Sequence, residues 1–352
     1  MDSQAFDFFK LLLETPSPSG YEQRIQAVVR KYVAEFADEV RGDVHGNLIS
    51  VRNPGARLRV MLAGHCDQIG FIIQHIDSDG FLWIQPVGGW DPQVLIGQKL
   101  TVWPDGEPLA GVVARKPIHL LTDEERKAVP KLKDMWLDIG AKDREQAASL
   151  VAVGDPITLE LGYRPLLGKL ASAPGMDDKT GLWVAIEALR RTKGKKLNCS
   201  LYAVSTAQEE IGLRGAMTST HSIEPHVGIA IDVTHATDCP TIDKKQEGDV
   251  AVGKGPVIYR GPNMNPRVVT QLFAAAKGKE IPYQLAANGR ATGTDANTIQ
   301  TSRGGVAAAL VSIPNRYMHS PVEVISLDDL DHAADLLAEF ALGLTGDEDF
   351  RP

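Results

Sequence analysis

Two adjacent glutamates, Glu209 and Glu210, follow the apolar run CSLYAVST, which is typical of a buried strand of a parallel sheet. A lone Glu-Glu pair is most simply explained as part of a solvated loop. Other segments, however, also place a histidine or an acid where a strand ends, in the loop after a strand, or where a helix begins. These residues are His65 and Asp67 in GHCDQIGF, Asp177 and Asp178 in APGMDDKTG, Asp232 in GIAIDVTHA and His319 in IPNRYMHSP. Because ligands of doubly wound sheets gather outside the carboxyl ends of the strands, these residues together predict a metal site.

Each segment also has a simpler explanation when it is taken alone. Asp177 and Asp178 stand where a helix begins, and acids there cap helices, but one aspartate suffices for a cap and the second is in surplus. Side chains two apart in a strand share a face, so His65 and Asp67 point together while Cys66 points away. Cys66 is therefore expected to pack in the core, and Asp67 could orient the imidazole of a metal-bound His65.

Two histidines with several carboxylates, and no cysteine among the candidates, suit zinc, cobalt or manganese. Asp177 could bridge two ions, and a water shared by them would form hydroxide near neutral pH. A hydrolase also needs a group that takes the proton of this water and passes it to the leaving amine. Adjacent glutamates could divide these tasks, with Glu210 as ligand and Glu209 as general base, although the spacing alone leaves the order of the two open.

The elements that must position these residues follow an α/β pattern. Helices are expected over 2–15 and from about residue 21, followed by a hairpin that turns at HGN and by the strand LRVMLAG. From about Pro165, helical and strand segments alternate, which predicts a mostly parallel sheet flanked by helices. Residues 68–161 are short strands separated by turn signals such as DSDG and PDGE, which predicts an inserted all-β barrel or sandwich. Residues 1–67 and 162–352 would then form one α/β domain that the insert interrupts.

The composition excludes several functional classes. The chain has 352 residues, a net charge of -8 and a pI near 5.6, so it lacks the basic surface that nucleic-acid binding needs. The sequence shows no signal peptide and no apolar run that could span a membrane, so we expect no membrane partner. The cysteines Cys66, Cys199 and Cys239 are odd in number and far apart, which favours a reduced, cytoplasmic protein over a disulfide framework.

The motifs GHCDQIGF, APGMDDKTG, AQEEIGLRGA, IDVT, GTDANTIQ and RYMHSPVE resemble, in order and spacing, those of the dinuclear metallo-aminopeptidases of the tetrahedral (TET) type. This family includes glutamyl aminopeptidases, and some members have been labelled endoglucanases or cellulases. The resemblance covers essentially the whole chain. It departs from the family at Cys66 and Gln68, where methionine and glutamate are common, and Gln68 could alter the surroundings of His65.

The resemblance implies two divalent ions per subunit, with zinc or cobalt as candidates. His65, Asp177 and Asp232 would bind one ion, and Asp177, Glu210 and His319 the other. Glu209 would be the catalytic base and Asp67 the carboxylate that steadies His65. It also implies a zinc-peptidase-like α/β domain with a PDZ-like insert, dimers formed through the insert, and tetrahedral dodecamers that process short peptides. The charged segment 122–134 could then project toward the active site of a neighbouring subunit.

Three other functions remain open at this stage. A related amidohydrolase, such as a deacylase or carboxypeptidase, would need a cation for its substrate, and Arg290 and Arg316 are available. A glycosidase would use two carboxylates and leave His65, Asp232 and His319 without a purpose. A non-catalytic metal-binding assembly protein would not need the spare Glu209. The preferred N-terminal residue is also open, because Arg214, Arg290 or Arg316 could favour acidic side chains but could equally be structural.

Overall fold

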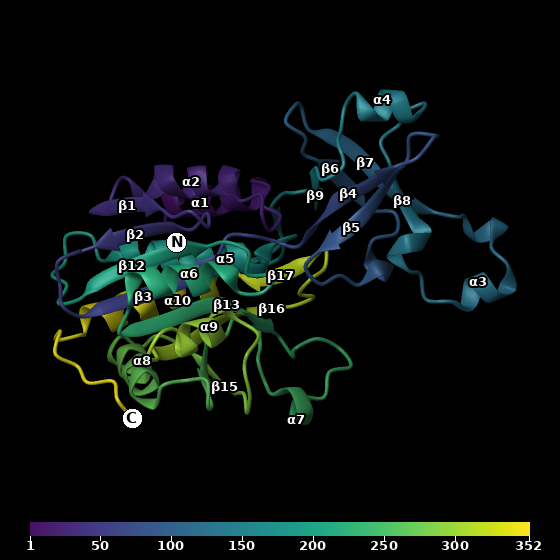
Figure 1. Cartoon of the computed structure of the whole chain (residues 1–352). Coiled ribbons are helices and arrows are strands. Elements are labelled where there is room, and N and C mark those ends of the chain that lie inside the picture. Colours follow the sequence, from purple (N-terminus) through teal and green to yellow (C-terminus); the bar gives the residue numbers. More distant parts are fainter.

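The computed structural model describes residues 1–352, which form two lobes (Figure 1). The larger lobe contains a central sheet with helices on both sides, and both chain termini lie on it. The smaller lobe is built mainly from strands and carries the short helix α3 (Asp123–Lys127) at its far end. The chain leaves the larger lobe after β3 (Arg59–His65) and has returned to it by β10 (Arg164–Pro165). None of the helices combines the length and the apolar composition that crossing a bilayer requires.

The central sheet has the strand order β1-β2-β12-β3-β13-β16-β14-β15. The four middle strands pair in parallel, whereas β1, β2 and β14 are antiparallel to their inner neighbours and β15 is parallel to β14. The sheet is therefore mixed, and the predicted parallel character describes its centre. The short turn at HGN forces β1 and β2 to be antiparallel, because parallel neighbours need a long crossover. The bounds are β1 (Glu39–Gly42), β2 (Leu48–Arg52), β12 (Ser200–Thr206), β13 (Val227–His235), β14 (Val257–Arg260), β15 (Gln284–Ala287) and β16 (Ala307–Asn315).

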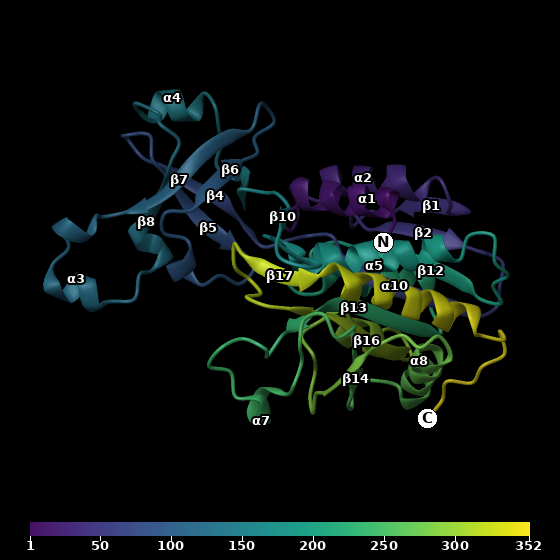
Figure 2. The same cartoon turned by 180° about the vertical axis from the view of Figure 1, so that it is seen from behind.

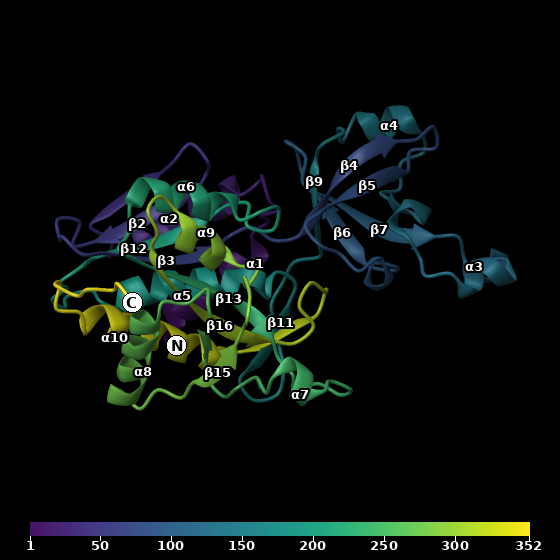
Figure 3. The same ribbon diagram turned by 60° about the horizontal axis from the view of Figure 1, so that its bottom comes forward.

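Helices cover the two faces of this sheet (Figures 2 and 3). On one face α5 packs against β3, β12 and β13, and α1 and α10 pack against α5, with α8 beside α10. On the other face α6 and α9 lie side by side against β12, β13 and β16. The bounds are α1 (Ser3–Glu14), α2 (Gln23–Val33), α5 (Met176–Arg191), α6 (Arg214–Ile223), α8 (Pro266–Gly278), α9 (Asp295–Thr301) and α10 (Leu327–Leu342).

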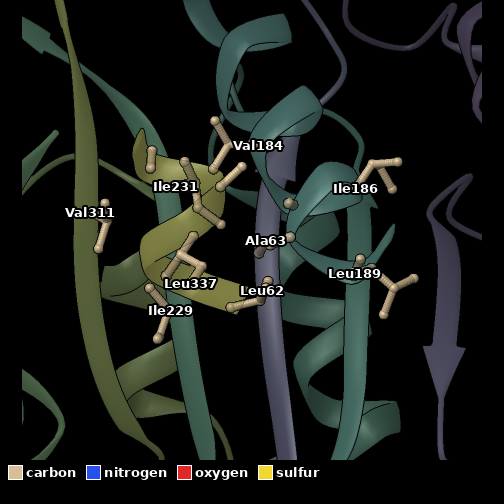
Figure 4. Packing of buried hydrophobic residues seen from close by; sticks show 14 of the residues in the cluster. Leu62, Ala63, Val184, Ile186, Leu189, Ile229, Ile231, Val311 and Leu337 are labelled. Carbon is tan, nitrogen blue, oxygen red and sulfur yellow. The ribbon is translucent and has the colours of Figure 1, made fainter. Parts of the chain in front are cut away.

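In the core of the larger lobe, β3 packs closely against α5. Figure 4 shows the side chains of β3, β13, α5 and α10 that fill this region, among them Leu62, Ile231 and Leu337. The two backbones approach so closely that a Cβ atom at Gly64 would overlap the backbone of Gly181. A glycine at position 64 is therefore required, and it lets α5 at Gly181 lie directly beside the end of β3.

The smaller lobe is a closed barrel with the strand order β4-β5-β8-β7-β6-β9. It has its own apolar core, which includes Phe71, Leu100 and Ile157. Closure removes the free strand edges that a short open sheet would expose. The PDZ likeness that the family resemblance implies stays a prediction. The bounds are β4 (Gly70–Ile76), β5 (Leu82–Val87), β6 (Lys99–Val102), β7 (Leu109–Arg115), β8 (Met135–Asp138), β9 (Pro156–Leu159) and the short helix α4 (Arg144–Ala148).

A small antiparallel sheet, β10-β11-β17, completes the larger lobe. It consists of β10, β11 (Leu170–Ala173) and β17 (Glu323–Ser326), and Ala173 pairs with Glu323. β11 leads into α5 and β17 follows the loop that contains His319, so this pairing brings the two segments together. The helix α7 (Lys244–Glu247) lies in the connection between β13 and β14.

Candidate metal centre

The carboxyl ends of the four parallel strands deliver the candidate residues to one edge of the sheet. β3 ends at His65, whose register partner is Thr206 at the end of β12, just before the turn that contains Glu209 and Glu210. Asp232 lies near the end of β13, and the loop after β16 carries His319. The fold thus brings together residues that lie far apart in the sequence, as the strand-end pattern predicts for this class of sheet.

The two aspartates at the start of α5 have different surroundings. Asp178 is a helix cap, because one carboxylate oxygen accepts a hydrogen bond from the backbone N–H of Gly181 at 2.9 Å and the other from that of His65 at 3.2 Å. Asp177 has its carboxylate between the two histidines instead. Its Oδ1 atom lies 3.1 Å from Nε2 of His65, and its Oδ2 atom lies 3.2 Å from Nε2 of His319. The surplus aspartate of the sequence is therefore the one that faces the histidines.

The distances between these donor atoms suit bound ions. Two donors on one tetrahedral zinc ion, each about 2.0–2.1 Å from the metal, lie about 3.3 Å apart. The distances on either side of Asp177 fit this value, and Nε2 of His319 lies 3.5 Å from Oε2 of Glu210. Donor atoms within 4.8 Å of one another form two groups, one of His65, Asp177 and Glu210, the other of His65, Asp178 and Asp232. These groups differ from the two ligand sets of the resemblance in placing Glu210 beside His65 and in including Asp178.

The electrostatics of the site also call for cations. Burial and the repulsion of Asp177 raise the pKa of Asp232 to about 8, and burial and the same neighbour raise the pKa of Glu210 well above its ordinary value. Burial and Asp232 raise the pKa of Glu209 to about 11. Oε1 of Glu210 is buried without a hydrogen-bond partner. Burial away from water and mutual repulsion keep these carboxyl groups protonated. A bound metal ion would restore their negative charge, so this set of residues fits divalent cations.

The imidazole of His65 is the main positive partner of these acids. Burial acts to lower its pKa, but the carboxylates of Glu209, Asp177 and Asp67 outweigh burial and raise the pKa of His65 well above its ordinary value. The ring nitrogen Nδ1 lies 3.0 Å from the backbone carbonyl oxygen of Asp67 and 3.5 Å from its Oδ1 atom. The nearer partner is thus the carbonyl, and both contacts direct Nε2 toward Asp177.

The Asp67 carboxylate has a second set of contacts that the sequence did not suggest. It is fully buried, and it accepts hydrogen bonds from the backbone N–H groups of Glu209 at 3.0 Å and Glu210 at 3.2 Å. The hydroxyl group of Ser19 donates a third, at 2.6 Å. Asp67 therefore fixes the turn that carries both glutamates. Its neighbour Cys66 is buried in the hydrophobic core, as the sequence predicts.

A second buried carboxylate, Glu323, has the matching place on the other side of the site. It accepts hydrogen bonds from the backbone N–H of Asp177 at 3.1 Å and from that of His319 at 2.8 Å. The ring of His319 is also held from the barrel, because its Nδ1 atom lies 2.9 Å from the carbonyl oxygen of Gly89. The sequence alone gives Glu323 no role, although it lies in the motif RYMHSPVE.

Asp295, in the motif GTDANTIQ, is a further acid that sequence analysis left without a role. It is buried at the start of α9, and its Oδ2 atom accepts a hydrogen bond from the Thr206 hydroxyl group at 2.7 Å. Its other oxygen has no partner. Asp295 is close enough to Asp232 and Glu209 to raise the pKa of both, so it adds to the negative charge around the donor groups. The sequence feature that could have indicated this role is the acid Asp295 inside GTDANTIQ, a motif typical of the start of a helix.

Comparison with known proteins agrees with this geometry. The family model for M42 glutamyl aminopeptidase matches residues 46–336. The chain belongs to this family. Membership makes the protein an aminopeptidase, a metal-dependent hydrolase of peptide bonds, as the sequence predicts. The family to which the motifs of the sequence point is thereby confirmed.

The similarity to individual members extends over nearly the whole chain. A lysyl aminopeptidase of Pyrococcus furiosus is 37% identical over 336 residues, which are 94% of this chain and 95% of that protein. A TET aminopeptidase from a marine-sediment Thaumarchaeota archaeon has a TM-score of 0.91 at 35% identity, with 96% of each chain covered. The TET1 peptidase of Pyrococcus horikoshii, which can assemble into a tetrahedron or a large octahedral shell, has a TM-score of 0.86 at 31% identity, covering 97% of this chain and all of that one.

Proposed function

We propose that this aminopeptidase removes N-terminal residues from short peptides with the help of two divalent ions and of Glu209 as general base. The observation that carries the proposal is the position of the Asp177 carboxylate between Nε2 of His65 and Nε2 of His319, at 3.1 and 3.2 Å. A carboxylate with one histidine on each side is suited to bridging two ions. The unused glutamate beside Glu210 would supply the proton transfer that hydrolysis needs.

The proposed ligands of one ion are His65, Asp177 and Asp232, and those of the other are Asp177, Glu210 and His319. The ions, zinc or cobalt, would lower the pKa of a water molecule and polarise the scissile carbonyl group. Asp178 is left out of this assignment, because both of its oxygens already accept backbone hydrogen bonds. The acids of the site, rather than neutral donors, account for the preference for doubly charged ions.

Glu209 is proposed to move the proton. Its Oε2 atom lies 3.8 Å from Nε2 of His65, so the carboxylate faces the donor groups, while Asp67 holds its backbone N–H. Burial raises the pKa of the Glu209 carboxyl group, which increases its affinity for a proton. As a C–O bond to the carbonyl carbon forms, Glu209 takes the proton of the attacking water, and as the C–N bond breaks it passes this proton to the leaving amine.

The charge of the site favours substrates with a free amine. Buried acids attract an ammonium group and repel the C-terminal carboxylate that a carboxypeptidase must bind. Of the arginines that could bind such a carboxylate, Arg316 donates two hydrogen bonds to Asp238, at 2.8 and 2.6 Å, and is therefore engaged within the chain. Carboxypeptidase activity thus has less support than aminopeptidase activity. Because the chain belongs to a peptidase family, nothing favours glycosidase activity.

We also propose that residues 68–161 form a PDZ-like oligomerisation domain inserted between residues 1–67 and 162–352 of the peptidase domain, and that subunits assemble through dimers into a tetrahedral dodecamer. The segment that carries α3 exposes large apolar side chains, among them Ile118, Leu120 and Val129. Apolar groups gathered on a projecting segment favour contact with another subunit. A single species of monomer mass in light scattering at micromolar concentration would contradict this proposal.

The cytoplasm is the proposed location. All three cysteines are free, and two of them, Cys66 and Cys199, are buried. A reducing compartment keeps such thiols as they are.

The activity can be tested with a panel of aminoacyl-p-nitroanilides. The protein is first stripped with a chelator and then reloaded with zinc or cobalt. We expect release of nitroaniline that depends on the metal and that is absent when the same substrates are N-acetylated. The panel also ranks the side chains that the enzyme prefers. Release from N-acetylated substrates would favour the amidohydrolase alternative, and metal binding without any release would favour a non-catalytic assembly protein.

A further inference from the structure

The segment between α1 and α2, PSPSGYE, ends the first helix, but its contacts reach the candidate catalytic turn. The backbone carbonyl oxygen of Ser17 accepts a hydrogen bond from the N–H of Gln68 at 2.9 Å, next to Asp67. The hydroxyl group of Ser19 donates to Oδ2 of Asp67. Further along, the hydroxyl group of Tyr21 donates to the carbonyl oxygen of Gly154 in the barrel at 2.6 Å. The segment therefore lies against two separate parts of the chain, residues 67–68 and the barrel.

The side chain of Glu22 completes this arrangement. It is 5% exposed, and a single oxygen, Oε1, accepts hydrogen bonds from the N–H groups of Gly20 at 2.8 Å and Gln208 at 3.1 Å. Gln208 precedes Glu209, so three consecutive backbone N–H groups, those of residues 208 to 210, are bound by two buried carboxylates. Glu22 binds the first of them, and Asp67 binds the second and third.

This turn needs external support because it cannot be held by regular backbone hydrogen bonding alone. Gln208 has a φ of 56°, in the left-handed region that residues other than glycine seldom adopt. Successive N–H groups that point to one side form a concave anion-binding surface. Here the anions that fill it are protein side chains, and they fix the direction in which the next two side chains leave the turn.

We propose that Ser19 and Glu22 are positioning residues, which hold the Gln208–Glu210 turn so that Glu209 and Glu210 face the donor groups of the site. Glu22 acts through the N–H of Gln208, and Ser19 acts through Asp67. This inference rests on the proposed roles of Glu209 and Glu210.

The contacts also define what a substitution can preserve. Both hydrogen bonds to Glu22 end on the same oxygen atom, and a glutamine at this position would keep a carbonyl oxygen there. The role therefore needs an acceptor and no negative charge. Alanine removes the acceptor and leaves the partly buried N–H of Gln208 without this partner, which allows the turn to move.

The test compares Glu22→Ala, Glu22→Gln and the control Glu14→Ala, which removes an exposed glutamate at the end of α1. For each zinc-loaded protein, kcat and KM are measured on the best p-nitroanilide, and the zinc dissociation constant is measured by competition with a chromogenic chelator. For Glu22→Ala we expect kcat to fall about tenfold and zinc to bind about tenfold more weakly, with KM within about twofold of the wild-type value. Glu22→Gln should stay within about threefold in all three quantities, and Glu14→Ala should match the wild type.

Ser19→Ala is the second variant, and it keeps the test decisive if Glu22→Ala fails to fold. It removes the hydrogen bond at 2.6 Å to Asp67, so we expect kcat to fall several-fold and Ser19→Thr to restore it. Wild-type kcat and zinc affinity in both alanine variants would overturn the inference, and so would an equal loss in Glu22→Gln and Glu22→Ala. If the wild type itself shows no turnover, the proposed function fails, while the zinc affinities still decide whether Glu22 positions the turn.

Discussion

The two histidines of the site, which Asp177 connects, lie in very different surroundings. The side chain of His65 is 2% exposed and that of His319 is 35% exposed. His65 ends a central strand, and its polar contacts are with residues of the larger lobe. His319 lies in a loop, and its ring is held by the carbonyl oxygen of Gly89 in the barrel. One half of the site is therefore closed inside a single lobe, and the other half is open and assembled from both lobes.

Each half has a buried carboxylate that organises it. Asp67 binds the backbone of Glu209 and Glu210 on the closed side, and Glu323 binds the backbone of Asp177 and His319 on the open side. The comparison indicates a division of work. The closed half fixes the direction of the proposed base, and the open half holds the proposed ligands Asp177 and His319, of which His319 is partly exposed.

The largest effect is expected for Glu209→Gln, which changes the chemistry of the closed half and leaves its contacts in place. The amide cannot accept the proton of the attacking water, so we expect kcat to fall by about 10²–10⁴-fold. The metal content, measured by atomic absorption, should stay at the wild-type value because the proposed ligands are intact. Unchanged turnover would contradict the assignment of Glu209, and loss of metal would mean that this residue is a ligand.

Replacing each histidine with alanine compares the stability that the two halves contribute. His65→Ala takes a buried cation away from Asp177 and Glu209, which we expect to destabilise the metal-free protein by about 3–5 kcal/mol. His319→Ala removes a partly solvated contact and should lower the melting temperature less, although both variants should lose most of their turnover.

Added imidazole sharpens this comparison. The open position of His319 should admit it, so millimolar imidazole with zinc should restore part of the activity of His319→Ala. The closed position of His65 should not admit it. Equal rescue of both variants would contradict the difference in access, and so would rescue of His65→Ala alone.

The sequence predicts the candidate residues that lie at strand ends or in the segments just after them, but not Glu22 and Glu323. His65, Glu210 and Asp232 follow apolar runs, and the central parallel strands must bring their ends together. Glu22 and Glu323 come from a helix entry and a short edge strand, where an acid is ordinary and its burial depends on distant packing.

The contact of His319 with Gly89 could not be predicted at all, because a backbone carbonyl oxygen leaves no trace in the side-chain pattern. The direction of the outer strand β14 of the central sheet also could not be predicted from the sequence. The antiparallel direction of β14 depends on the path of the long connection after β13, which contains several turn signals and no regular pattern.

Asp67→Asn and Glu323→Gln compare the two organising carboxylates. Each amide presents an N–H group to backbone N–H donors, and we expect a loss of about 10–100-fold in kcat/KM for each variant. The two losses should differ in kind. Asp67→Asn should act mainly on kcat, because it releases the turn with the proposed base, and Glu323→Gln mainly on zinc affinity, because it releases two proposed ligands. Steady-state kinetics at saturating zinc separates these effects, and a loss in Glu323→Gln that excess zinc does not repair would contradict the division of work.

The smallest effect is expected where the barrel touches the open half, in the comparison of Gly88→Ala with Gly89→Ala. A Cβ atom at Gly89 would lie 3.4 Å from Nδ1 of His319, a contact that a small rotation of the ring relieves. We expect zinc affinity and kcat/KM to fall by less than the roughly tenfold cost of losing an outer partner, because the carbonyl oxygen remains.

Gly88→Ala is the matched control, because it changes the backbone of the same loop away from His319. Gly88 has a φ of 79°, and a Cβ atom there would overlap the side chain of Ile69 and would lie in ordinary contact, at 3.5 Å, with the Cβ atom of Glu210. We expect this variant to lose about 1–3 kcal/mol of stability and to change zinc affinity only through that loss. Zinc affinity could also stay unchanged in Gly89→Ala and fall in Gly88→Ala. This result would mean that the position of the whole loop, rather than the single carbonyl contact, holds His319. The open half would then depend on the barrel as a body, and the contrast between the two histidines would be one of lobes rather than of individual contacts.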